Sequence, residues 1–157
     1  MNTCQICGRE IKAKNGLIAH HGYKRPDAGW QTASCMGARH LPYEVSNDVL
    51  PIAIENVFNY IENTLKKLED FTNNPPKTLT TKRTIHGHRS PNFGQKVEET
   101  YEMPKGFSGR EKQVSYSTKN YYEFEYFRLQ YAMTKDIEQS KLDLEYLKAR
   151  LANWKKL

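Results

Sequence analysis

Three cysteines and a pair of adjacent histidines near the N-terminus have the types and spacing of a metal site. Cys4 and Cys7 are two residues apart, and His20 follows Cys7 after twelve residues. A Cys-x2-Cys turn places two thiolates on one side of a metal, and zinc prefers thiolate and imidazole ligands. We predict one zinc ion with four ligands: Cys4, Cys7, His20 and Cys35. His21 is the substitute for either neighbouring ligand, because adjacent histidines of a helix point in different directions.

Four protein ligands would make this a closed, structural zinc site, because no coordination position is left for an activated water. The chain has no phosphate-binding glycine loop and no recognisable nucleophile triad. We therefore predict no catalytic residues and a protein that is not an enzyme, with a metal-dependent hydrolase as the minor alternative. An odd number of cysteines in metal-ligand spacing favours a reducing compartment, the cytoplasm.

The apolar residues Ile11 and Leu17 stand between the second cysteine and His20. With them, residues 4–20 resemble the zinc finger of the two-cysteine, two-histidine type, in which two apolar positions form a small core beneath the metal. No histidine follows His20 at the family's spacing, so the resemblance over residues 4–35 is to a Cys-Cys-His-Cys variant. It implies a finger helix that ends just after His21. We recognise no whole-chain family.

The same resemblance bears on DNA recognition. The helix positions that contact bases in that family correspond here to Ala13, Gly16 and Ala19. None of these side chains can form the paired hydrogen bonds that distinguish bases. The resemblance therefore implies no base-specific readout.

Basic residues are concentrated in two segments of a chain whose formal net charge is +6. Residues 1–45 contain six basic and three acidic side chains, and residues 75–119 contain nine and four. Local positive charge attracts polyanions through counterion release. We predict a non-enzymatic protein that contacts nucleic acid, DNA or RNA, through phosphate-directed surfaces. The candidate contacts are Lys12, Lys14, Tyr23, Lys24, Arg25, Lys82, Arg83, His88, Arg89 and Arg110.

The alternative partner is a protein. In that interpretation the chain is an adaptor or inhibitor of the size of a phage or mobile-element accessory factor, and the zinc module is only structural. The coiled coil and the insert described next would then provide the docking surface.

The remaining sequence predicts two helices separated by a β insert. The first helix spans about 48–72, after the N-cap residues 46–48 and before the Asn-Asn-Pro-Pro run at 73–76. Its apolar stripe is Ile54, Phe58, Ile61, Leu65 and Leu68. The basic insert covers about 77–117, with strands at Lys77–Ile85 and Gln95–Tyr101.

The second helix spans about 118–156, and aromatic residues between 121 and 131 are expected to form core around its start. Its heptad seam is Met133, Ile137, Ser140, Leu144, Leu147, Leu151 and Trp154.

These elements predict a mainly α fold with a small β insert, in two domains. An N-terminal zinc-finger module, 1–45, precedes an antiparallel two-helix coiled-coil hairpin, 46–157; a parallel homodimer through the same seams is the rival packing. Because the second helix is longer, we expect Leu151, Trp154 or Leu157 to contact residues 1–45. The longest apolar stretches are only a few residues, which predicts no membrane segment.

Overall fold

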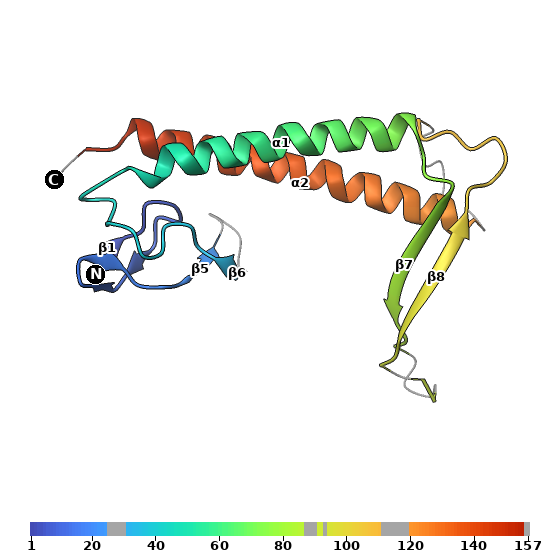
Figure 1. The fold of residues 1–157 in the computed structure, drawn as a ribbon, viewed down its shortest axis with the longest axis horizontal. Helices are drawn as coiled ribbons and strands as arrows, with labels where there is room; N and C mark the ends of the chain where they lie inside the picture. Colours follow the sequence, from blue (N-terminus) through green and yellow to red (C-terminus); the bar gives the residue numbers. More distant parts are fainter. Residues whose placement is uncertain (25–30, 87–90, 93, 111–119, 156–157) are drawn as a thin grey trace. The chain divides into compact units, whose positions relative to one another are not determined.

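The computed structural model describes residues 1–24, 31–86, 91–92, 94–110 and 120–155 (Figure 1). It contains two long helices, α1 (Val49–Asn73) and α2 (Tyr121–Ala152). The strands are β1 (Asn2–Thr3), β2 (Glu10–Ile11), β3 (Ala13–Lys14), β4 (Leu17–Ile18), β5 (Gly22–Lys24), β6 (Gln31–Ser34), β7 (Thr78–Thr84) and β8 (Lys96–Glu102). They pair in order as four two-stranded antiparallel sheets.

The chain divides into two compact units. Unit 1 consists of Met1–Asn63 and Ile137–Leu157, and unit 2 consists of Thr64–Asp136. Each helix therefore contributes one part of its length to each unit. The division into domains 1–45 and 46–157 stays a prediction.

The predicted fold class, mainly α with a coiled-coil hairpin, is wrong. Two helices are combined with four antiparallel sheets, and the described part of residues 1–45 contains six short strands and no helix. The finger helix that the resemblance implies is therefore also wrong. On α1, the expected seam residues Phe58 and Leu65 are 51% and 38% exposed, whereas Thr64 is buried. The buried stripe of α1 is thus rotated away from the heptad seam.

The start of α1 is fixed by side chains from two segments. Ser46 Oγ donates a 2.6 Å hydrogen bond to Asp48 Oδ1 and accepts one from the Asp48 amide at 3.2 Å. Gln5, which is fully buried, accepts a hydrogen bond from the Val49 amide at 3.1 Å and donates one to Asp48 at 2.9 Å. These bonds satisfy amide groups that the first turn of a helix leaves without partners.

The core of unit 1 joins the cysteine-containing segment to both helices. Its buried residues are Cys4, Ile6, Cys7, Ile18, Cys35, Val49, Leu50, Ala53 and Leu147. Leu151 packs against this core, and Trp154 Nε1 donates a 2.6 Å hydrogen bond to the Tyr43 carbonyl. The predicted contact between the end of the second helix and residues 1–45 is therefore confirmed for Trp154. Leu151 packs against the core that residues 1–45 share with both helices, and Leu157 lies outside the described residues.

The core of unit 2 is aromatic. Tyr122 and Tyr126 are fully buried and cluster with the buried Leu79, and Phe71 stacks on Tyr126 with ring centroids 4.5 Å apart. The start of α2 therefore supplies core residues, as expected. Other aromatic residues of this stretch face solvent: Tyr121 is 68% exposed and Tyr131 63%. Neither described helix has an apolar stretch long enough to cross a bilayer.

Candidate metal centre

Four potential ligands converge in unit 1. One ligand atom each from Cys4, Cys7, His21 and Cys35 lies within 4.8 Å of the other three. Cys4 Sγ is 3.7 Å from Cys35 Sγ, and Cys7 Sγ is 3.4 Å from His21 Nε2. Ligand atoms around a tetrahedral zinc are about 3.3–3.8 Å apart, given its bond lengths of about 2.0–2.3 Å. Both separations match, so the residues present fit a metal ion of this kind.

The Cys4–Cys7 pair lies in a tight turn between β1 and β2. The Gly8 amide donates to the Cys4 carbonyl at 3.1 Å, and the Cys4 amide donates to the Arg9 carbonyl at 2.9 Å. Gly8 has a φ of +69°, which a residue without a side chain adopts at no steric cost. We call residues 4–8 the knuckle. It directs two thiols to the same side.

The other two ligands are brought together by the β5–β6 hairpin. Gly22 is paired with Ser34, so His21 and Cys35 stand side by side just beyond this pair. The Cys35 amide donates a 2.9 Å hydrogen bond to the His21 carbonyl. Near them, a Cβ atom on Gly37 would overlap Cys4 Sγ, so the chain passes the sulfur at a distance that only glycine permits.

The structure brings the three predicted cysteines together with His21, the substitute, and places His20 outside the cluster. His21 Nδ1 donates a 2.8 Å hydrogen bond to the Ala19 carbonyl, which leaves the Nε2 lone pair free to bind a metal. His20 Nε2 instead lies 3.0 Å from Ser34 Oγ, where it is exposed. The strand pairing next to His21, rather than the spacing of a finger helix, selects the histidine.

The three thiols of the cluster influence one another's ionisation. Hydrogen bonds from the Cys35 and Cys4 thiols lower the pKa of Cys7, whereas hydrogen bonds to Cys4 and Cys7, together with burial, raise the pKa of Cys35. Three buried thiols this close cannot all ionise without a compensating positive charge. A divalent cation would supply that charge, because metal binding requires and stabilises thiolates.

The candidate nucleic-acid residues are distributed over both units. Lys12, Lys14 and Lys24 are exposed in unit 1, where Tyr23 packs partly buried against the core. In unit 2 the β7–β8 hairpin pairs Lys82 with Glu98 at 2.7 Å and Arg83 with Glu99 at 2.5 Å. Arg110 donates a 2.8 Å hydrogen bond to Asn73 Oδ1. Arg25, His88 and Arg89 lie outside the described residues.

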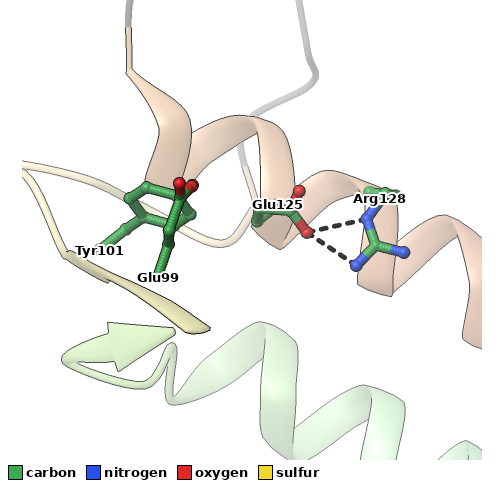
Figure 2. A network of polar contacts seen from close by, with 4 residues as sticks. All are labelled: Glu99, Tyr101, Glu125 and Arg128. Carbon is green, nitrogen blue, oxygen red and sulfur yellow. Dashed lines mark hydrogen bonds and ion pairs between the residues drawn. The ribbon is translucent and has the colours of Figure 1, made fainter. Parts of the chain in front are cut away.

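Acidic side chains also lie beside the basic and aromatic residues at the base of this hairpin. Figure 2 shows Tyr101 next to Glu99, to which its hydroxyl donates a hydrogen bond, and the ion pair of Glu125 with Arg128 at 2.7 Å. The hydrogen bond from Tyr101 lowers the pKa of Glu99, so this carboxylate remains charged beside Arg83. Lys82 and Arg83, two of the basic residues that the sequence predicts as contacts, are therefore paired with carboxylates in the described part of unit 2.

Comparisons with protein-family models, with curated proteins and with solved structures gave no match. The interpretation of the site therefore depends on its own geometry.

Proposed function

We propose that this chain is a non-enzymatic zinc-binding protein with one structural zinc ion held by Cys4, Cys7, His21 and Cys35. The observation that carries the proposal is the convergence of four ligand atoms within 4.8 Å, three of them on cysteines with at most 6% exposure. Three sulfurs and one nitrogen form a typical structural zinc set, which supplies folding free energy. All four positions are taken by protein atoms, so the site has no place for a metal-bound water.

Zinc content and two histidine variants test this ligand set. Protein purified without chelator should contain about one zinc per chain by elemental analysis. His21→Ala should lower the zinc affinity by more than about 100-fold, because even groups that only orient a ligand contribute about 10–100-fold. His20→Ala is the matched control and should bind zinc like the wild type. Negligible zinc in the wild-type protein, or equal losses in the two variants, would contradict the proposal.

The partner we propose is the phosphate backbone of nucleic acid, contacted from unit 1 without base readout. Support comes from the exposed lysines Lys12, Lys14 and Lys24, which pair with no carboxylate in the described part of the chain. Lys14 lies on β3, and Lys24 lies on β5, the strand that follows the ligand His21. Lys82 and Arg83 of the β7–β8 hairpin support this role less, because each is already paired with a carboxylate.

Salt-dependent titration tests the nucleic-acid role. Mixed-sequence single- and double-stranded oligonucleotides should bind with an affinity that falls steeply with salt and is similar for all sequences. The triple variant Lys12→Glu/Lys14→Glu/Lys24→Glu should reduce the slope of log K against log salt by about 2–3, since each lost phosphate contact removes about 0.7–0.9. Lys66→Glu/Lys67→Glu/Lys141→Glu makes the same charge change on the helices and should preserve most of the slope.

Absence of binding at low salt would exclude the nucleic-acid role and favour a protein adaptor or inhibitor. One observation in unit 2 fits that alternative: a groove of about 510 Å³ lies between the hairpin and the start of α2. Its lining includes the exposed rings Tyr121 and Phe124 beside Arg83 and the Glu125–Arg128 pair. Aromatic residues and arginine are enriched in protein-binding surfaces.

A further inference from the structure

The last turns of α2 contact the backbone of the knuckle directly. Arg150 Nε donates a 2.9 Å hydrogen bond to the Gln5 carbonyl, and Arg150 Nη2 donates a 3.1 Å hydrogen bond to the Cys4 carbonyl. One planar guanidinium thus binds two successive carbonyl groups next to the first ligand. Because the N–H donors of a guanidinium are fixed in one plane, the two hydrogen bonds restrict the orientation of both peptide groups.

Arg150 is itself held in place by an aromatic residue of unit 1. Its guanidinium lies over the Tyr43 ring, 4.1 Å from the centroid, and the Tyr43 hydroxyl donates a 2.6 Å hydrogen bond to the Arg150 carbonyl. Trp154 then donates to the Tyr43 carbonyl at 2.6 Å, and the Tyr43 amide donates to Thr3 at 2.9 Å. These contacts connect the end of α2 to the residue that precedes Cys4.

The knuckle also packs against α2 without spare room. A Cβ atom on Gly8 would lie 2.5 Å from the Tyr146 hydroxyl and 3.1 Å from Arg150 Nη1. Both ends of the knuckle therefore touch side chains of α2. A displacement of α2 would remove support from the whole turn that carries two ligands.

The positive charge of Arg150 also favours its position beside the knuckle. Three thiolates, a neutral imidazole and one Zn²⁺ together carry one net negative charge. The guanidinium contributes one positive charge to the knuckle, and charged groups interact strongly where water is largely excluded.

We propose that Arg150 is a positioning residue of the metal centre, which holds the knuckle in the ligand-binding conformation and couples zinc binding to docking of the α2 C-terminal turns. The inference rests on the proposed zinc site. By linkage, zinc stabilises the docked helix end by the same free energy with which the docked end strengthens zinc binding. A purely structural role would lower the stability of unit 1 without changing the zinc affinity of the folded protein.

The test measures zinc affinity and helix docking separately. In a Trp30→Phe background, Trp154 is the only tryptophan, and its emission reports whether the α2 end is docked on Tyr43. Zinc affinity is measured by competition with a chromophoric chelator. Arg150→Ala should bind zinc about 10–100-fold more weakly, and Arg150→Lys, which keeps the charge but not the fork, should lie between it and the parent. Lys148→Ala, which removes an exposed pair with Glu145 on the same turn, is the matched control and should change affinity less than twofold.

Removal of zinc from the parent should shift the Trp154 emission to longer wavelength, and addition of zinc should restore it. If Arg150→Ala fails to fold, Arg150→Lys and Tyr43→Phe test the proposal instead. Tyr43→Phe removes only the hydrogen bond to the Arg150 carbonyl and should weaken zinc binding about 3–10-fold. Zinc affinities equal to the Lys148→Ala control, or an emission that does not respond to zinc, would overturn the coupling and leave the zinc site intact. A parent protein without zinc is a different result, which would refute the proposed function itself.

Discussion

Removal of zinc is expected to unfold residues 1–45 while the β7–β8 hairpin of unit 2 stays folded. The strands β1 to β6 contain two to four residues each, and sheets this small are not stable alone in water. Binding of a structural zinc supplies about 10–16 kcal/mol in small modules, as much as the whole stability of an ordinary domain. Without the metal, Cys4, Cys7 and Cys35 in the core of unit 1 are no longer linked through a shared ion.

Hydrogen exchange resolved by segment measures this effect. Addition of a strong chelator, or the variant Cys7→Ser, should abolish protection of amides such as Cys4, Ile18 and Cys35, which donate backbone hydrogen bonds in the intact module. Amides of the β7–β8 ladder, such as those of Leu79 and Tyr101, serve as the internal control. Protection of residues 1–45 that survives complete zinc removal would show that the metal is not a structural element.

Substitution of Tyr126 by alanine is expected to destabilise unit 2 by about 3–5 kcal/mol, the cost of removing a large buried aromatic side chain. Tyr126 is fully buried, stacks on Phe71, and meets Phe107 edge-to-face at 4.9 Å. Its hydroxyl also donates a 2.8 Å hydrogen bond to the Phe71 carbonyl. Tyr126→Phe keeps the ring and should cost only about 1 kcal/mol.

The measurement is the urea dependence of hydrogen exchange in β7 and β8, with zinc present throughout. Tyr131→Ala is the matched control, because this tyrosine lies on the same helix and is 63% exposed; its cost should stay near 0.5 kcal/mol, roughly the limit for surface substitutions. Equal costs for Tyr126→Ala and Tyr131→Ala would contradict the assignment of the unit 2 core.

The positions of the helices could be predicted from the sequence because local signals mark where a helix begins and ends. Residues 46–48 cap the first turn of α1, and Pro75 and Pro76 follow its end. The side that α1 buries is harder to predict, because Val57 and Phe58 are adjacent apolar residues that define two different stripes. The core selects the stripe with Val57 and leaves Phe58 half exposed. A heptad pattern in sequence therefore did not imply a coiled coil.

The metal ligands, too, could be predicted from the sequence only in part. Cys4 and Cys7 can be recognised from their spacing, and Cys35 is the one other cysteine of the chain. The choice between His20 and His21 depends on which residue adjoins the Gly22–Ser34 pair, and strands of two to four residues leave no periodic signal. The contacts of Arg150 join residues 145 and 146 positions apart, so no local pattern could reveal them.

The close passage of Gly37 beside Cys4 Sγ has a consequence for finding related chains. A side chain at this position would collide with a ligand sulfur, so homologues that keep the centre should carry glycine two residues after the last cysteine. The search signature is then Cys-x2-Cys-x13-His-x13-Cys-x-Gly, with equal intervals on either side of the histidine. This signature depends on the knuckle and the hairpin alone, and it leaves the helices and the insert free to diverge.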